Sequence, residues 1–249
     1  TSKGSLDAWS YIPKFYTALQ QPIAQLIFCM TFAAPLMKYG SGEARNCFLN
    51  LYSAKGGLGK STVLRFASSI WGDPEKSFFQ KDSSNVAKLK RLGVWHNLPA
   101  MMDEITHVKE DDLSNLVFSI ITGEEKQRLS QSSDFKPYGD WTTCVIATSN
   151  KAAKEIVARH HPDTDAGILR IMDYECDFEP FVPGSWQQQL YHVCDQISRE
   201  NYGLAGPEFI YQLLQFLPQI LSNGHVLILP HAVSSFDRFF DRHDNHTLQ

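Results

Sequence analysis

Residues 54–61 have the sequence Ala-Lys-Gly-Gly-Leu-Gly-Lys-Ser, and this run decides the fold. Its three glycines allow the backbone to wrap around an anion, so that successive N–H groups and the start of the following helix point toward it. The usual first glycine is Ala54 here, a small residue that the wider motif accepts. A short β-prone run, Cys47–Tyr52, precedes the loop, and Ser61–Ile70 follows it with the apolar spacing of a helix. Strand, loop and helix in this order predict a P-loop.

A P-loop of this kind binds the phosphates of Mg-ATP. We expect Lys60 to bridge the β- and γ-phosphates and the Ser61 hydroxyl to ligate Mg²⁺. A chance glycine-rich turn is the alternative, and the complete spacing with a strand and a helix on either side argues against it. The predicted cofactors are therefore ATP and Mg²⁺, and the predicted nucleotide contacts are Ala54, Lys55, Gly56, Gly57, Leu58, Gly59, Lys60, Ser61 and Thr62.

Two acidic residues follow the next buried strand. The apolar run Leu98–Met102 ends in Asp103-Glu104, and Pro99, which lacks an N–H donor, indicates that the strand starts after it. A carboxylate at the end of a strand beside a P-loop can hold Mg²⁺ through water, and an adjacent glutamate can polarise the attacking water. We expect Asp103 to join Ser61 as a metal ligand and Glu104 to act in hydrolysis. An ordinary acidic cap for the next helix is the alternative.

Two further polar residues are candidates for catalysis. Asn150 closes the β-branched run Thr142–Thr148 and is predicted to contact the γ-phosphate and position the water, although strands also end in Ser-Asn for turn reasons alone. Arg170 is the first candidate for a cation that a neighbouring subunit supplies to the transition state, and Arg159 is the second. A surface ion pair is the alternative for either arginine.

A polar segment, Lys126–Tyr138, lies between the Asp103-Glu104 strand and the Asn150 strand. If it forms a hairpin that projects into a ring pore, Lys126, Arg128 and Lys136 could grip the phosphates of DNA. A solvated hairpin without a function is the alternative, and the sequence leaves both open.

Composition limits the class of protein. The 249 residues suffice for one sizeable α/β domain with a helical appendage. The net charge of −4 gives no global positive field, so any nucleic-acid contact must come from a local patch. Five cysteines without metal-ligand spacing argue against a zinc site and a disulfide scaffold, which fits a reducing cytoplasm. The most apolar stretch, Ile23–Met37, is shorter than the roughly 20 residues of a membrane span and indicates a buried helix.

The expected organisation has three parts: a helical lead-in over 1–43, a P-loop core over 44–183 and a helical region over 184–249. The lead-in has helical spacing that breaks at Gln21-Pro22. Strands alternating with helices predict an α/β three-layer sandwich with a mainly parallel central sheet. Further helices are predicted over Asn85–Leu92, Asp111–Ile121, Trp186–Ile197 and Pro207–Leu221, and a further strand over Gly167–Tyr174. Because the chain starts at Thr1 without a signal-like segment, we expect it to be part of a longer polypeptide.

Several of these motifs resemble one family. Gly57–Pro74, His96–Glu104, Gly123–Arg128 and Thr148–Asn150 look like the corresponding segments of phage and plasmid replicative helicase-like ATPases, long described as a domain of unknown function. That family is similar to the superfamily 3 and AAA+ ring helicases. The resemblance implies an AAA+-like P-loop NTPase fold. It also supports the roles given above to Lys60, Ser61, Asp103, Glu104 and Asn150.

The resemblance further implies a function. It suggests an ATP-dependent DNA helicase motor from a mobile element, acting as a hexameric ring on single-stranded DNA in the bacterial cytoplasm, with a fused or partner primase. The long acidic helix before Gly123 and the lack of a recognisable second sensor arginine depart from the pattern. An ATPase that remodels or loads proteins, or an NTP-dependent switch, is the alternative. A nucleotide kinase is disfavoured because no arginine-rich lid is apparent.

Overall fold

The computed structural model describes residues 1–39, 46–55, 57, 59–79, 83–107, 109–124, 139–161, 168–176, 178 and 181–222. Within this part of the chain, five strands form one sheet in the order β2-β3-β4-β1-β5, and every neighbouring pair is parallel. The strands are β1 (Cys47–Tyr52), β2 (Phe78–Phe79), β3 (Ala100–Met102), β4 (Cys144–Ser149) and β5 (Ile171–Glu175). The predicted α/β class with a parallel central sheet is confirmed.

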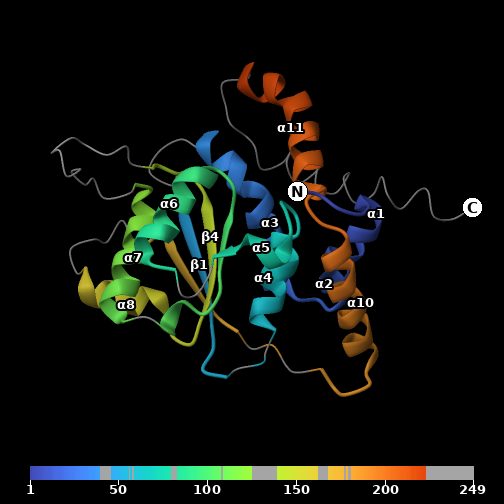
Figure 1. The fold of residues 1–249 in the computed structure, drawn as a ribbon, viewed down its shortest axis with the longest axis horizontal. Coiled ribbons are helices and arrows are strands. Elements are labelled where there is room, and N and C mark those ends of the chain that lie inside the picture. Colours follow the sequence, from blue (N-terminus) through green and yellow to red (C-terminus); the bar gives the residue numbers. More distant parts are fainter. Residues whose placement is uncertain are drawn as a thin grey trace, which may run out of the picture.

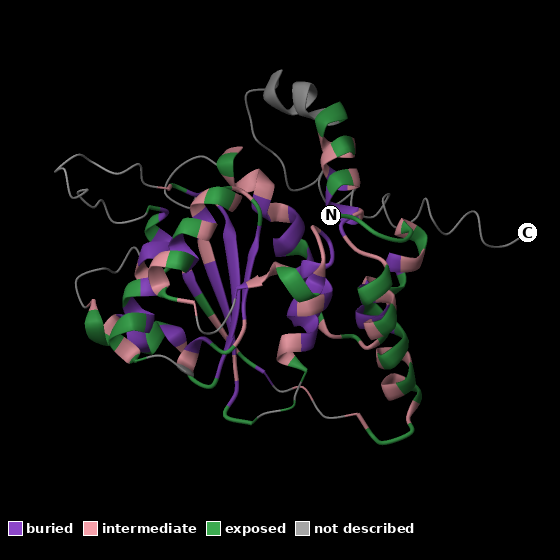
Figure 2. Cartoon of the chain, viewed as in Figure 1, coloured by how far each residue is buried: buried purple, intermediate pink, exposed green. Residues whose placement is uncertain are grey.

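Helices cover both faces of the sheet (Figure 1). On one face, Leu49 and Leu51 of β1 share a core with α3 (Pro22–Ala33) and α4 (Lys60–Ser68). On the other face, Phe48 packs with α6 (Asn85–Trp95), α7 (Glu110–Thr122) and α8 (Ala153–His160). Alternate residues of a strand point to opposite faces, so β1 and β4 are buried on both sides, as Figure 2 shows by the purple colour of the strands. This arrangement is the predicted three-layer sandwich.

The N-terminal lead-in is helical as predicted. It consists of α1 (Leu6–Trp9), α2 (Tyr11–Ala18), α3 and the 3₁₀ helix η1 (Ala34–Tyr39). The predicted break at Gln21-Pro22 is confirmed, because Pro22 is the first residue of α3. Pro13 lies in the first turn of α2, where its missing N–H has no intrahelical acceptor to lose.

The C-terminal region contains α10 (Trp186–Glu200) and α11 (Ala205–Ser222). α10 packs against α2 (Figure 1) and is tied to α4 by an ion pair of 2.8 Å between Arg65 and Asp195. One hydrophobic core draws residues from the N-terminal helices, α4, α10 and the start of α11. Residues from all three predicted parts therefore share one core, and the domain boundaries at 43/44 and 183/184 stay predictions. Among the described helices, none combines the length and apolar character needed to cross a bilayer.

Several elements differ from the predictions. Residues 153–160 form α8, which was not predicted, and the short α5 (Pro74–Ser77) and β2 were also missed. The start of α8 has no local cap: the Asp173 carboxylate of β5 accepts its first N–H groups, from Ala153 at 2.9 Å and Lys154 at 2.7 Å. A cap supplied from another strand leaves no signal in the local sequence. The predicted strand Gly167–Tyr174 begins only at Ile171. The polar segment Lys126–Tyr138, expected to be a β-hairpin or an extended loop, lies outside the described residues.

Candidate functional site

Three predicted motifs meet at one edge of the sheet. β1, β3 and β4 are parallel neighbours, so their carboxyl ends lie at the same edge, a usual place for ligands in open α/β sheets. The P-loop follows β1, Asp103-Glu104 follows β3 and Asn150 follows β4. They border a single cavity of about 420 Å³, whose lining includes Gly57, Gly59, Lys60, Ser61, Glu104 and Asn150.

The loop geometry suits an anion. Gly57 and Gly59 have φ angles of +76° and +84°, in the left-handed region that other residues rarely adopt. No atom lies within 4 Å of a Cβ placed at either position, so backbone conformation and not space calls for glycine. α4 begins directly at Lys60. The N–H groups of Thr62 and Val63 donate to the Gly59 carbonyl at 3.1 Å, whereas those of Lys60 and Ser61 precede the first acceptor of the helix and are placed to face an anion.

Several of the predicted nucleotide contacts interact within the loop. The Lys60 ammonium donates to the carbonyl oxygens of Ser53 at 3.2 Å and Lys55 at 3.4 Å. The Lys55 backbone N–H donates to the Ser53 hydroxyl at 3.2 Å. Gly56 and Leu58, also predicted contacts, lie outside the described residues. Two carbonyl groups of the loop therefore hold the Lys60 ammonium beside the start of α4.

The two predicted magnesium ligands are in direct contact. The Ser61 hydroxyl donates to Oδ1 of Asp103 at 2.7 Å, and the Thr148 hydroxyl donates to the same oxygen at 2.5 Å. A hydroxyl and a carboxylate beside a phosphate-binding loop provide the oxygen ligands that Mg²⁺ prefers, together with substrate phosphates and water. Ser61 and Asp103 thus fit a magnesium ion, and residues from α4 and from the end of β3 would hold it.

Thr148 also fixes the backbone of Glu104. Glu104 has a φ of +48°, which is uncommon for a residue with a Cβ, and its backbone N–H donates to Oγ1 of Thr148 at 2.9 Å. Thr148 is 1% exposed, whereas the Glu104 side chain is exposed at the cavity. Sequence reasoning assigned no role to Thr148. Its signal is weak, a hydroxyl in a buried β-run two residues before Asn150, and only the register of β3 against β4 reveals its partners.

The loop that carries Asn150 is anchored on both sides. The Asn150 backbone N–H donates to the Thr106 hydroxyl at 3.2 Å. From the middle of the sheet, the buried Asn50 donates its amide to the Lys151 carbonyl at 3.2 Å and to Asp173 at 2.6 Å. Because Asp173 also caps α8, the strand end, the loop and the following helix are held together. Asn150 is exposed and lines the cavity beside Glu104.

The structure does not bring Arg170 to this cavity. Arg170 precedes β5, whose first residue, Ile171, is paired with Phe48 near the start of β1, so it lies at the edge opposite the P-loop. Its guanidinium donates to the Ile121 carbonyl in the last turn of α7 at 3.0 Å. Arg159 forms an ion pair of 3.3 Å with Glu110. Lys126, Arg128 and Lys136 lie outside the described residues.

Glu110 forms ion pairs with two cationic side chains at the surface. Lys151 donates to it at 3.0 Å, and Arg159 lies on its other oxygen. The hydrogen bond from Lys151, followed by the charges of Arg159 and Lys151, lowers the pKa of Glu110 below its ordinary value. The interaction joins the start of α7 to the loop after Asn150 and to the end of α8.

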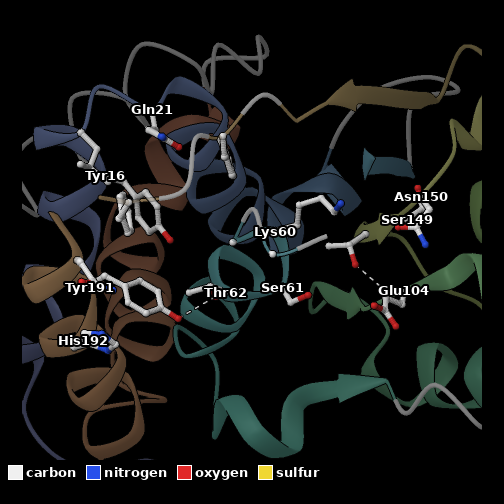
Figure 3. Close-up of a pocket in the computed structure, with 17 residues that line it drawn as sticks. Tyr16, Gln21, Lys60, Ser61, Thr62, Glu104, Ser149, Asn150, Tyr191 and His192 are labelled. Carbon is white, nitrogen blue, oxygen red and sulfur yellow. Dashed lines mark hydrogen bonds between the residues drawn. The ribbon is translucent and has the colours of Figure 1, made fainter. Parts of the chain in front are cut away.

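Sequence reasoning missed the other end of the cavity. It is lined by aromatic side chains from distant segments: Tyr16 of α2, Phe178 and Phe181 after β5, and Tyr191 of α10. The Tyr191 hydroxyl lies 3.3 Å from that of Thr62 on the P-loop helix (Figure 3). Tyr16 lies in the predicted helical lead-in, and no local pattern links α2 to α10.

Comparisons with known proteins give a family and a similar fold. A family model described as "Domain of unknown function (DUF927)" matches residues 1–138. Among curated proteins, none matches the sequence significantly. A solved structure described as "SCCmec type IV Cch - active helicase" is similar, with a TM-score of 0.64 and 21% sequence identity. The match covers 89% of this chain and 40% of that one, so the chain spans less than half the length of that protein. At this identity the similarity establishes the fold.

Proposed function

Since the chain belongs to the DUF927 family of domains of unknown function, whose model matches more than half of it, we propose that it is the ATP-hydrolysing motor domain of a DNA helicase. One observation carries the proposal. The P-loop with Ser61, Glu104 and Asn150 follow three separate strands and border one cavity, and Asp103 accepts a hydrogen bond from Ser61. The similarity in fold to a chain described as an active helicase supports the nucleic-acid part.

Each residue has a defined task in this proposal. Lys60 and the N–H groups at the start of α4 bind the phosphates and offset their negative charge. Ser61 and Asp103 would hold Mg²⁺, which neutralises charge that develops on the phosphate oxygens during transfer. Glu104 accepts a proton from the attacking water, and the Asn150 amide orients that water against the γ-phosphate.

The cavity also bears on assembly. Among the described residues that line it, Lys60 is the only lysine or arginine. Phosphoryl transfer usually gains from a second cation at the transition state, so we expect a neighbouring subunit to supply an arginine. Arg170 stays the first candidate from the sequence and Arg159 the second, although both are engaged within their own chain.

In its full form, the proposal describes a motor related to the superfamily 3 and AAA+ helicases that acts as a hexameric ring on single-stranded DNA. It comes from a phage or another mobile element, works in the bacterial cytoplasm, and has a primase as a fused or partner domain. The helicase and protein-remodelling functions would use the same catalytic residues. Only dependence on DNA separates them.

Steady-state ATP hydrolysis, with and without single-stranded DNA, tests the proposal. The protein should be assayed at concentrations that favour assembly, with Glu104→Gln as the matched control that keeps the side-chain size and removes the base. We expect DNA to stimulate hydrolysis and the stimulation to vanish in the control. Hydrolysis that ignores DNA would favour the remodelling ATPase, and absence of hydrolysis from the assembled wild-type protein would refute a motor function.

A further inference from the structure

The aromatic end of the cavity is formed by side chains from separate segments of the chain that pack together. Two distant helices and the segment after β5 contribute to it, and two of their rings, Phe181 and Tyr191, contact each other. The Phe181 and Tyr191 rings lie 6.0 Å apart with an interplanar angle of 52°, and the Phe66 and Tyr191 rings lie 6.2 Å apart. Phe66 is fully buried in the core, so Tyr191 is supported from beneath by a fixed side chain.

Tyr191 also has a polar anchor. Its hydroxyl lies within hydrogen-bond distance of Thr62, two residues after Lys60. α10, which carries Tyr191, is held to the P-loop helix by the Arg65–Asp195 ion pair. The position of the aromatic ring relative to the phosphate-binding loop is therefore set by contacts on two successive turns of α10. Such preorganisation lowers the cost of ordering side chains when a ligand binds.

Tyr16 forms another part of the same surface. It is 6% exposed and packs against Phe66, with ring centroids 6.1 Å apart. Burial raises the pKa of Tyr16, so its hydroxyl stays neutral. Gln21, at the start of α3, and His192, beside Tyr191, bring polar groups to the same end of the cavity. The surface thus combines flat apolar faces with a small number of hydrogen-bonding groups, as ligand sites commonly do.

The order of chemistry along the cavity identifies the ligand class. Figure 3 shows Tyr16, Gln21 and Tyr191 at one end, Lys60 and Ser61 in the middle, and Glu104 and Asn150 at the other end. A nucleoside triphosphate has the same order: a flat heterocycle, an anionic chain, and a terminal phosphate that water attacks. Resting on the proposed function of the P-loop, we propose that Tyr16, Phe178, Phe181 and Tyr191 form the subsite for the purine base of the nucleotide.

The subsite has a consequence for the whole chain. Two of its walls, Tyr16 and Tyr191, belong to α2 and α10, which lie in the helical regions before and after the P-loop core, and the segment after β5 supplies the rest. A base between them contacts both regions at once, while the phosphates contact the core. Aromatic stacking accepts any base in principle, because every base has a π face, and a purine offers the larger area. We therefore expect purine triphosphates to bind more tightly than pyrimidine triphosphates, and both more tightly than inorganic tripolyphosphate.

Calorimetric binding to the Glu104→Gln protein, which should not consume its ligand, tests the subsite. The probes are Mg-ATP, Mg-CTP and Mg-tripolyphosphate. We expect Tyr191→Ala to weaken ATP binding by about tenfold, which corresponds to about 1.4 kcal/mol of lost stacking, and to leave tripolyphosphate binding unchanged. Tyr191→Phe, which keeps the ring, should retain most of the ATP affinity. Tyr211→Ala is the matched control, because Tyr211 is an exposed tyrosine on α11 that does not line the cavity.

The outcomes separate the two proposals. If the Glu104→Gln protein with Tyr191 intact binds ATP and tripolyphosphate with equal affinity, the base subsite is overturned and the P-loop assignment stands. This comparison does not depend on whether a Tyr191 variant folds. Full ATP affinity in Tyr191→Ala would also overturn the subsite. Lys60→Ala should weaken binding of both ATP and tripolyphosphate, and unchanged affinity for both would instead remove the proposed nucleotide function.

Discussion

Replacing Thr148 by valine is the sharpest test of the site, because the change keeps the shape of the side chain and removes one oxygen. That oxygen donates to Asp103 at 2.5 Å and accepts the Glu104 N–H at 2.9 Å. A hydrogen bond to a charged group contributes about 1.5–3 kcal/mol. The left-handed backbone of Glu104, which costs on the order of 1 kcal/mol or more, would also lose its support.

We expect these effects to appear in the chemical step. If about 2 kcal/mol of the lost interaction belongs to the transition state, kcat falls about 30-fold. ATP affinity should change little, because Lys60 and the start of α4 remain in place. Thr148→Ser, which restores the hydroxyl, should recover most of the lost rate.

The assay pairs steady-state hydrolysis at saturating ATP with a binding measurement and a thermal unfolding curve for each variant. The reasoning is refuted if Thr148→Val keeps the wild-type kcat. It is refuted equally if the rate falls only in proportion to nucleotide affinity or to the folded fraction, since Thr148 would then act in binding or in folding and not in positioning Glu104.

Other parts of the structure make further predictions. Asp173→Asn should destabilise the fold by about 1–2 kcal/mol in denaturant unfolding, because α8 loses its charged cap, and an unchanged midpoint would contradict that capping role. Arg65→Ala should lower the free energy of unfolding by about 1 kcal/mol, because the half-buried ion pair with Asp195 holds α10. It should also weaken ATP binding more than tripolyphosphate binding, and an equal loss of affinity for the two ligands would contradict this role of α10. Arg170→Ala should lower the melting temperature, because the Ile121 carbonyl loses its donor; unchanged melting with abolished hydrolysis would identify Arg170 as the arginine supplied to a neighbouring subunit. Glu110→Gln should reduce the loss of unfolding free energy at acid pH. The pKa of Glu110 is lower in the folded than in the unfolded protein, so its stabilising contribution is present above the ordinary glutamate pKa and is lost as the pH falls through the folded pKa. The same dependence of unfolding free energy on pH in both proteins would contradict this.

The sequence is informative where chemistry and structure are local. The glycine spacing before Lys60 requires particular backbone angles, and β3 begins after Pro99 because proline cannot donate to a strand ladder. It is uninformative where a partner comes from elsewhere in the chain. α8 depends on Asp173 for its cap, and β2 has only two residues, too few for any periodic pattern.

The same distinction divides the candidate site. Ser61, Asp103, Glu104 and Asn150 could be named from the sequence, because parallel strands bring their carboxyl ends to one edge. The role of Thr148 depends on the register between β3 and β4, and the aromatic surface depends on α2 packing against α10. Packing between segments that far apart has no periodic signature in either one.

The positive φ of Glu104 has a consequence for which residues position 104 tolerates. Glycine, asparagine and aspartate adopt this backbone at low cost, whereas valine, isoleucine and threonine resist it. A library of all substitutions, sorted separately for folded protein and for ATP hydrolysis, should therefore give two different rankings at this position. Small and amide residues would lead the first, and glutamate would stand alone in the second, so the preferences of the backbone and of the chemistry become separable at a single codon.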